Sequence, residues 1–234
     1  MKLYALIDTE TTGLDPQKNQ LLEVGIIVFN EDLKSCDFEV IPIKHKEYVV
    51  SAKAMEVNGI DLIEHEKTAY DENQACDMIL NFLSNVEYDQ KYIFAGQNCP
   101  FDRAFIEEMF KRNGKIKEWN SLVDYHSLDL MGLAIGESLK GNLQFDDYKL
   151  DTISSALNVP KPADFKYLNS DDVIIHTNRH RALYDCLLEL NCIQAICGKE
   201  LTTPERLNEG IFQLREFDEL TYQLEQEGIA ERDR

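Results

Sequence analysis

Residues 3–13, LYALIDTETTG, constrain this chain more than any other stretch. The five apolar or aromatic residues at positions 3–7 predict a strand that is covered on both faces. Asp8 and Glu10 follow directly, and strand side chains alternate between faces, so the two carboxylates project to one side. Open α/β sheets bind their ligands at the carboxyl ends of such strands. A plain polar turn ending at Gly13 explains the same residues, so the rest of the chain must decide.

Length, cysteine content and net charge limit the class of protein. A chain of 234 residues buries one large core or at most two small ones. Its six cysteines show neither C-x-x-C nor zinc spacing, which is typical of reduced thiols in the cytoplasm. No apolar stretch is long enough to span a bilayer, so we expect a cytoplasmic protein with no membrane partner. The net charge of −19 argues against nucleic-acid binding unless basic side chains gather locally.

Apolar periodicity and turn residues predict an α/β order of elements. Strands are expected at 3–7, 21–29, 36–43 and 91–95, and helices at 51–57, 71–86, 100–114, 150–157, 179–196 and 202–226. The first three strands are joined by short turns, which predicts an antiparallel meander. Residues 122–130 mix strand and helix signals, and the remainder of 136–178 is expected to be turns. We therefore expect one domain over residues 1–200 and a further helix behind it.

The last segment, residues 201–234, is an acidic helix in this interpretation. It holds nine acids against four bases and an apolar stripe, listed by position as 207, 211, 214, 217, 220 and 224. Such a stripe either packs on its own domain or docks a protein partner, including a second copy in a homodimer. We favour packing on its own domain.

Two later stretches carry further polar groups. Asp102 lies near the start of a helix that directly follows a strand, where the helix dipole alone also favours an acid. His180 and Asp185 lie within about one and a half turns of each other near the start of another helix. His176 precedes His180 by four residues, which raises zinc as an alternative, although no third soft ligand is near.

These three stretches together resemble the motifs of the DEDD exonucleases, which degrade DNA or RNA from the 3′ end. Residues 8–13 (DTETTG) resemble the first motif and residues 96–102 the second, while the third is a histidine followed five positions later by an aspartate, as in His180 and Asp185. Three ordered motifs with matching internal spacing are specific, and the resemblance covers roughly residues 1–197. Arg181 stands where the tyrosine branch has its tyrosine, so the chain resembles the histidine branch of proofreading subunits, ribonuclease T and oligoribonuclease. Gln97 departs from the histidine that is usual in motif two.

The resemblance implies a ribonuclease H-like, mixed five-stranded sheet flanked by helices. It implies four metal ligands, Asp8, Glu10, Asp102 and Asp185, which would hold two Mg²⁺ or Mn²⁺ ions, with His180 as the general base. Hard oxygen ligands of this kind suit those cations, and paired divalent ions suit phosphodiester hydrolysis. The residues implied to hold the terminal nucleotide are Thr11, Thr12 and Leu14. Asn98 and Phe101 are weaker candidates at the other wall, and Phe101 fits a core position equally well.

The function expected from the resemblance is metal-dependent 3′–5′ hydrolysis of single-stranded DNA or RNA, releasing nucleoside 5′-monophosphates. The alternative is a catalytically idle nucleic-acid-binding or polymerase-associated subunit on the same fold, and the presence of all five key side chains disfavours it. Basic side chains at 111–117, 161, 166, 179 and 181 are candidates for local phosphate contacts. The choice between DNA and RNA depends on a 2′-hydroxyl contact that the sequence does not reveal.

Overall fold

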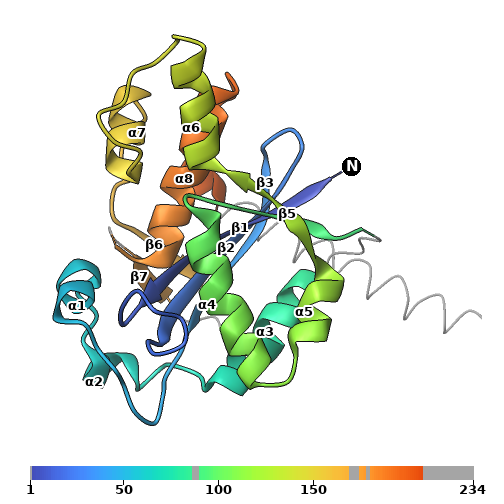
Figure 1. Cartoon of the computed structure of the whole chain (residues 1–234), viewed down its shortest axis with the longest axis vertical. Coiled ribbons are helices and arrows are strands. Elements are labelled where there is room, and N and C mark those ends of the chain that lie inside the picture. The colour runs from blue at the N-terminus through green and yellow to red at the C-terminus, as the bar shows by residue number, and fades with distance from the viewer. Residues whose placement is uncertain (1, 86–89, 169–173, 178–179, 208–234) are drawn as a thin grey trace, which may run out of the picture.

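The computed structural model describes residues 2–85, 90–168, 174–177 and 180–207, and its centre is a five-stranded sheet in the order β3-β2-β1-β4-β5 (Figure 1). β1 pairs antiparallel with β2, which pairs antiparallel with β3, whereas β1–β4 and β4–β5 are parallel. The predicted meander and the mixed sheet are therefore confirmed. The strands are β1 Leu3–Thr11, β2 Leu21–Asn30, β3 Ser35–Pro42, β4 Tyr92–Gly96 and β5 Val123–Asp129.

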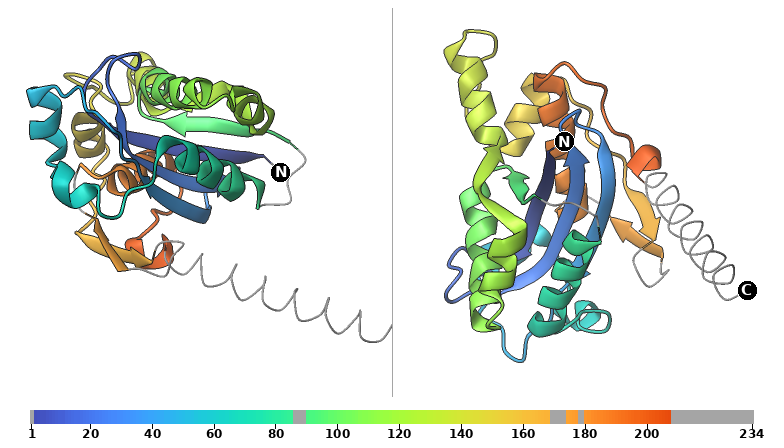
Figure 2. Two further views of the ribbon diagram at one scale, coloured as in Figure 1. Left: turned by 90° about the horizontal axis from the view of Figure 1, so that it is seen from below. Right: turned by 90° about the vertical axis from the view of Figure 1, so that its right-hand side faces the viewer.

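Helices cover both faces of the sheet, and the blue strands lie between α4 and α8 in the left view of Figure 2. Leu3, Ala5 and Ile7 of β1 pack in one core with α3, α4 and α5, while Leu6 packs in the other core with α8. This two-sided burial explains the continuous apolar run at the start of the chain. The helices are α1 Ala52–Asn58, α2 Leu62–His65, α3 Glu72–Ser84, α4 Cys99–Arg112, α5 Ile116–Leu122, α6 Leu130–Leu139, α7 Leu150–Ala156 and α8 Ala182–Ile196.

Local helix signals in the sequence correspond to observed caps. Asp71 and Gln74 form the reciprocal capping box expected at the start of α3. Gly59 ends α1 in the left-handed region, with φ of 63°. Pro100 lies in the first turn of α4, where its missing N–H would have no partner in any case.

The stretch from 116 to 177 differs most from expectation. Residues 123–129 form β5, an edge strand whose Tyr125 is 81% exposed, and α6 begins at the next residue. An edge strand that exposes large side chains and runs straight into a helix has neither clear alternation nor a turn signal, which is why the boundary was not predicted. The expectation of turns around the one predicted helix, α7, was wrong in part, because α6 and a two-stranded sheet of β6 Phe165–Leu168 and β7 Ile174–Thr177 also lie there.

Helix α8 begins later than expected, and the structure describes only the start of the predicted C-terminal helix. α8 begins at Ala182 rather than at residue 179, and His180 precedes it with φ of 62°. Residues 204–207 are helical and Leu207 is buried in the core that contains α8. The rest of the predicted helix over 202–226, with its partner or homodimer role, lies outside the described residues. Within the described part, none of the helices has the length and apolar character to cross a bilayer.

Candidate active site

β1 continues through both carboxylates instead of ending before them. Asp8 lies opposite Gly25 and Glu10 opposite Glu23 in the β1–β2 pairing, and a register shift follows Glu10. Asp8 and Glu10 extend the same face of β1 as Leu6, which is the face that packs against α8. The strand therefore aims both acids toward α8.

Close contact between α8 and β2 supplies the third acid. A Cβ placed at Gly25 would lie 2.7 Å from the carbonyl carbon of Ala182 and 2.8 Å from the amide nitrogen of Leu183. Only glycine fits that approach, which brings the first turn of α8 onto the sheet. As a result, one ligand atom from each of Asp8, Glu10 and Asp185 lies within 4.8 Å of the others.

Asp102 reaches the site from the opposite layer. It is buried in the first turn of α4, and its Oδ1 accepts a hydrogen bond of 2.7 Å from the Thr9 hydroxyl. Asp129 holds the start of α4, because its carboxylate accepts from the backbone N–H groups of Asn98 and Cys99. Asp102 is thus close enough to raise the pKa of Asp8 by charge repulsion, but it is not part of the group of three.

The acids repel one another in the absence of a cation. Burial raises the pKa of Asp8, and neighbouring carboxylates, Glu189 first among them, raise it further. Burial raises the pKa of Asp102 to about 7, against the opposing hydrogen bond from Thr9. For Glu10, burial raises the pKa most and Glu23 adds to the effect. Hard carboxylate oxygens gathered at this spacing fit a divalent cation, since a cation would relieve their repulsion.

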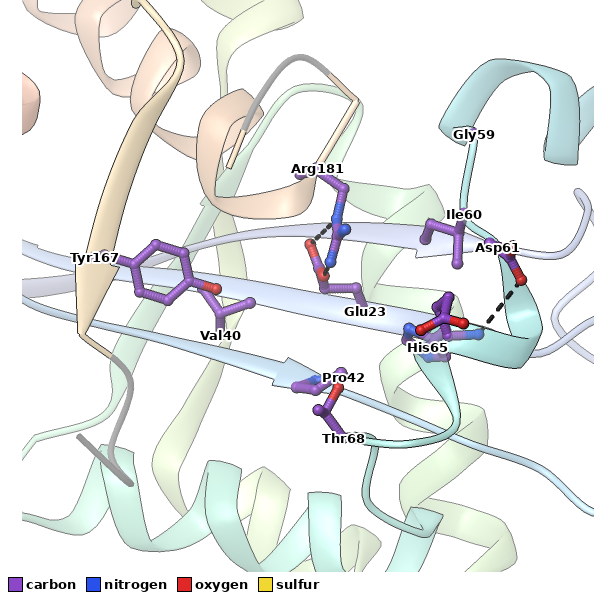
Figure 3. A pocket seen from close by; sticks show the side chains of 11 residues that line it. Glu23, Val40, Pro42, Gly59, Ile60, Asp61, His65, Thr68, Tyr167 and Arg181 are labelled. Atoms are coloured by element: carbon purple, nitrogen blue, oxygen red, sulfur yellow. Dashed lines mark hydrogen bonds and ion pairs between the residues drawn. The ribbon is translucent and has the colours of Figure 1, made fainter. Parts of the chain in front are cut away.

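His180 lies at the start of the segment that carries Asp185, next in sequence to an ion-paired residue. The sequence predicted His180 inside the helix, but the structure places it outside. His180 directly precedes Arg181, the N-cap of α8. Arg181 is bound by Glu23 through its Nε and Nη2 atoms (Figure 3). The same carboxylate accepts from the Ala182 backbone N–H at 3.0 Å. This pair fixes the residue that follows His180 to the sheet.

The ion pair also lines a hollow of about 360 Å³ next to α2 and β6 (Figure 3). His65 and Tyr167 complete its walls on those two sides. None of the three clustered acids lines it. This hollow is therefore distinct from the acid cluster.

A groove of about 260 Å³ opens beside Glu10. Three of the five residues implied for the terminal nucleotide line it, namely Thr11, Leu14 and Phe101. Leu14 is 81% exposed. The opposite wall comes from α1 and the residue before it, and is formed by Ser51, Lys53, Ala54, Val57 and Asn58.

The other two expected nucleotide contacts lie elsewhere. Thr12 is fully buried, and its hydroxyl bonds to Gln20 and to the Val49 carbonyl, so it supports the groove from behind. Asn98 is the exposed N-cap of α4 in the left-handed region and does not line the groove. Gln97, the departure from motif two, donates to the Tyr148 carbonyl at 2.9 Å.

Three residues of this region were not predicted from the sequence. Glu189 is a buried carboxylate one turn after Asp185 on α8, and the i, i+4 spacing was the available signal. Asn58 is buried and donates to the Thr11 carbonyl at 3.1 Å, which fastens α1 to the end of β1. Asp129 was not identifiable, because its role depends on the meeting of β5 with α4.

Several of the predicted phosphate-binding cations are engaged in ion pairs. Arg181 pairs with Glu23. Four more of these cations also form ion pairs, namely Lys111 with Glu107, Arg112 with Glu72, Lys115 with Asp77 and Lys161 with Asp151. Arg179 lies outside the described residues, as does the side chain of the alternative zinc ligand His176. The ion pairs reduce the number of cations that the sequence had made available for phosphate groups.

Comparison with known proteins decides the family. A family model described as an exonuclease matches residues 6–192. The chain belongs to this exonuclease family. Ribonuclease T of Actinobacillus pleuropneumoniae is 25% identical over 148 residues, which cover 58% of this chain and 67% of that protein. Ribonuclease T of Buchnera aphidicola is 29% identical, over 57% of this chain and 66% of that protein.

Solved structures of exonuclease I share the fold of this exonuclease-family chain. One has a TM-score of 0.69 at 17% identity and covers 91% of this chain and 44% of its own. E. coli exonuclease I in complex with a dT13 oligonucleotide has a TM-score of 0.67 at 18% identity, over 94% of this chain and 44% of that one. The chain therefore spans less than half the length of the exonuclease I chains, and the likeness confirms the ribonuclease H-like fold class.

Proposed function

We propose that this chain is a metal-dependent exonuclease that hydrolyses phosphodiester bonds at the 3′ ends of single-stranded nucleic acid and releases nucleoside 5′-monophosphates. One observation carries the proposal. The ligand atoms of Asp8, Glu10 and Asp185, which come from two elements far apart in sequence, lie within 4.8 Å of one another at the edge of a groove. Membership of the exonuclease family gives that cluster its reaction class.

The residues proposed to hold two Mg²⁺ or Mn²⁺ ions are Asp8, Glu10, Asp102 and Asp185. Four carboxylates offset the four positive charges of two divalent cations, and their hard oxygens match these metals better than softer ones. When bound, the cations would stabilise negative charge on the reacting phosphate oxygens. Thr9 orients Asp102 through the 2.7 Å hydrogen bond to its Oδ1.

His180 is the proposed general base. Its imidazole would take a proton from the attacking water, a role that requires the neutral ring. The left-handed backbone at His180, with φ of 62°, is uncommon for a residue that is not glycine. The ion pair with Glu23 anchors Arg181, the residue that follows His180. It therefore restricts the backbone that carries the imidazole.

The groove is the proposed site of the terminal nucleotide. Leu14 and Phe101 would contact the base and sugar, and Thr11 would lie beside the terminal sugar, because these three line the groove next to Glu10. Lys53 lies on the α1 side of the same groove, where a cation suits a phosphate. Asn98 stands as a weaker candidate outside this wall, and Thr12 would act only by supporting the loop.

Single strands are the proposed substrates. Solved relatives include exonuclease I bound to dT13 and dA16 oligonucleotides and a zinc-bound exonuclease I–ssDNA complex, whereas the similar curated proteins are named ribonuclease T. We place the exonuclease unit in residues 1–200. The five cysteines with described side chains are free thiols, which supports a reducing, cytoplasmic location.

Matched DNA and RNA oligonucleotides test the proposal. Each is labelled at its 5′ end and incubated with the full chain in Mg²⁺, in Mn²⁺ or in EDTA. We expect ladders that shorten from the 3′ end only with metal, and no shortening with Asp8→Ala, Glu10→Ala, Asp102→Ala or Asp185→Ala. Wild-type turnover by any of these four variants would refute the ligand set. Oligonucleotide binding without cleavage under every condition would favour the alternative of a catalytically idle subunit.

A further inference from the structure

A fifth carboxylate lies in the same interior as the candidate metal ligands. Glu189 follows Asp185 by four residues on α8, so the two side chains lie one helical turn apart on one face. Glu189 is 2% exposed. Glutamate side chains are rarely buried to this extent unless they are paired or bound to a cation. The burial of Glu189 therefore requires a physical reason.

The Glu189 carboxylate lies where the elements that carry two of the proposed ligands meet. A Cβ placed at Gly96 would be 3.6 Å from Glu189 Oε2, 3.1 Å from the Ile7 carbonyl oxygen and 3.8 Å from Cys99 Sγ. Ile7 directly precedes Asp8, and Cys99 begins the helix that carries Asp102. The side chain therefore lies behind Asp8 and Asp102 rather than in the groove.

The hydrogen bonds of this carboxylate are incomplete. Oε2 of Glu189 is fully buried and has no hydrogen-bond partner among the described residues. A backbone hydrogen bond from Gln97 favours the charged form, while burial and the charges of Asp102 and Asp185 oppose it and raise the pKa of Glu189. The neighbouring charges named here are negative, so they do not balance a charged Glu189 carboxylate. A bound cation would balance it.

We propose that Glu189 is a positioning residue of the metal centre, an outer carboxylate that strengthens divalent-cation binding on the side of Asp8 and Asp102. The inference rests on the proposed function, because it takes those two residues as ligands. Its effect is electrostatic, since the side chain adds a fifth negative charge behind the four that face the cations. Groups that hydrogen-bond metal ligands from outside change metal affinity by about 10–100-fold, and we expect a charge that acts without such a bond to lie at the low end of that range.

Mn²⁺ binding to the full chain measures the effect without any nucleic acid. Free Mn²⁺ is followed by electron paramagnetic resonance during a titration, for the wild type and for Glu189→Gln, which keeps the shape and removes the charge. We expect Glu189→Gln to bind Mn²⁺ about tenfold more weakly. Without metal it should melt no lower than the wild type, because a neutral amide of the same shape replaces a buried acid whose charge the surroundings disfavour.

Two further variants separate charge from packing and from the total charge of the chain. Glu189→Asp keeps the charge, so its affinity should stay within about threefold of the wild type by the same electrostatic argument. Glu108→Gln removes one charge from α4, the other ligand-bearing helix, and should leave affinity unchanged. Weakening by Glu108→Gln equal to that by Glu189→Gln would reduce the effect to net charge and overturn the inference.

Other outcomes also contradict the role of Glu189. Unchanged Mn²⁺ affinity in Glu189→Gln would overturn it, and so would a metal-free Glu189→Gln that is unfolded or melts below the wild type, since packing would then be its role. If the wild type binds Mn²⁺ no better than Asp8→Ala, the metal centre itself fails. If instead the wild type binds Mn²⁺ and Glu189→Gln binds it equally well, only the role of Glu189 fails.

Discussion

Glu23 on β2 and Arg181 at the start of α8 form a forked ion pair across 158 residues of sequence. Glu23 is buried, and 30% of the Arg181 side chain is exposed. The pair joins the sheet to the segment that carries His180 and Asp185. It is therefore one of the contacts that hold the third motif against the sheet.

Breaking that pair should destabilise the fold and impair catalysis together. Arg181→Met leaves the Glu23 charge buried without a partner, and we expect a loss of about 3 kcal/mol in the free energy of unfolding. Urea denaturation measures it. The double variant with Glu23→Leu should recover part of the loss, because both charges are then gone while the Ala182 N–H loses its acceptor. An Arg181→Met variant as stable as the wild type would show that the pair does not hold α8.

Gly25 sets the approach of α8 to β2. In Gly25→Ala the new methyl group meets the backbone of Ala182 and Leu183 at 2.7–2.8 Å, so α8 must move away, and with it Asp185. We expect a loss of about 1–3 kcal/mol in stability and a large loss of hydrolysis. Gly136→Ala is the matched control, because nothing lies within 4 Å of its Cβ, and it should gain about 0.5–1 kcal/mol as a helical residue. Equal effects of the two substitutions would contradict this interpretation.

The acid cluster makes the metal-free protein sensitive to pH. The pKa of Asp102 rises from 3.8 to about 7 on folding, so the folded state holds this proton more tightly than the unfolded state. Its stabilising contribution is complete below pH 3.8 and is lost as the pH rises to about 7. We expect the melting temperature in EDTA to fall between pH 5 and 7, and to fall less in Asp102→Asn. A pH dependence that is identical in the two proteins would exclude Asp102 as its source.

His180→Ala should slow hydrolysis by about 10²–10⁴-fold, the usual contribution of a positioned base. Wild-type activity should decline below about pH 6.5, where an ordinary imidazole is protonated. Mn²⁺ affinity should stay unchanged, because His180 is not proposed as a ligand. His126→Ala is the control, since that histidine pairs with Asp124 on the exposed edge strand. Loss of metal binding in His180→Ala would make His180 a ligand and revive the zinc alternative.

Substrate binding should depend weakly on salt. The chain has a net charge of −19, and two divalent ions change it only to −15 (−19 plus 4). Each phosphate contact contributes about −0.7 to the salt slope for single strands, and ion pairs engage several of the candidate cations. We expect a shallow slope and distributive digestion. Product lengths measured with a trap for released enzyme test this, and complete digestion in one encounter would require a basic channel.

The sequence by itself determined the β1–β2–β3 meander and the residue types of the site. Apolar runs, alternation and caps act over a few neighbouring residues, so the start of the chain, α3 and α4 were predictable from local order. The pairing of Asp8 with Glu10 on one face also follows from the two-residue period of a strand. The motif resemblance then joined these acids to Asp185 without any knowledge of their distance.

The tertiary structure decided which of these residues meet. Asp185 reaches Asp8 and Glu10 because Gly25 admits α8 to β2, and Asp102 is held by Thr9 from the other layer. The assignment of β5 depended on an edge position that no local pattern records. Packing between distant segments also decided that Thr12 is buried beneath the groove and that Glu189 is buried near the proposed metal ligands. Burial and charge proximity are sums over segments distant in sequence, and they are defined only once the chain has packed.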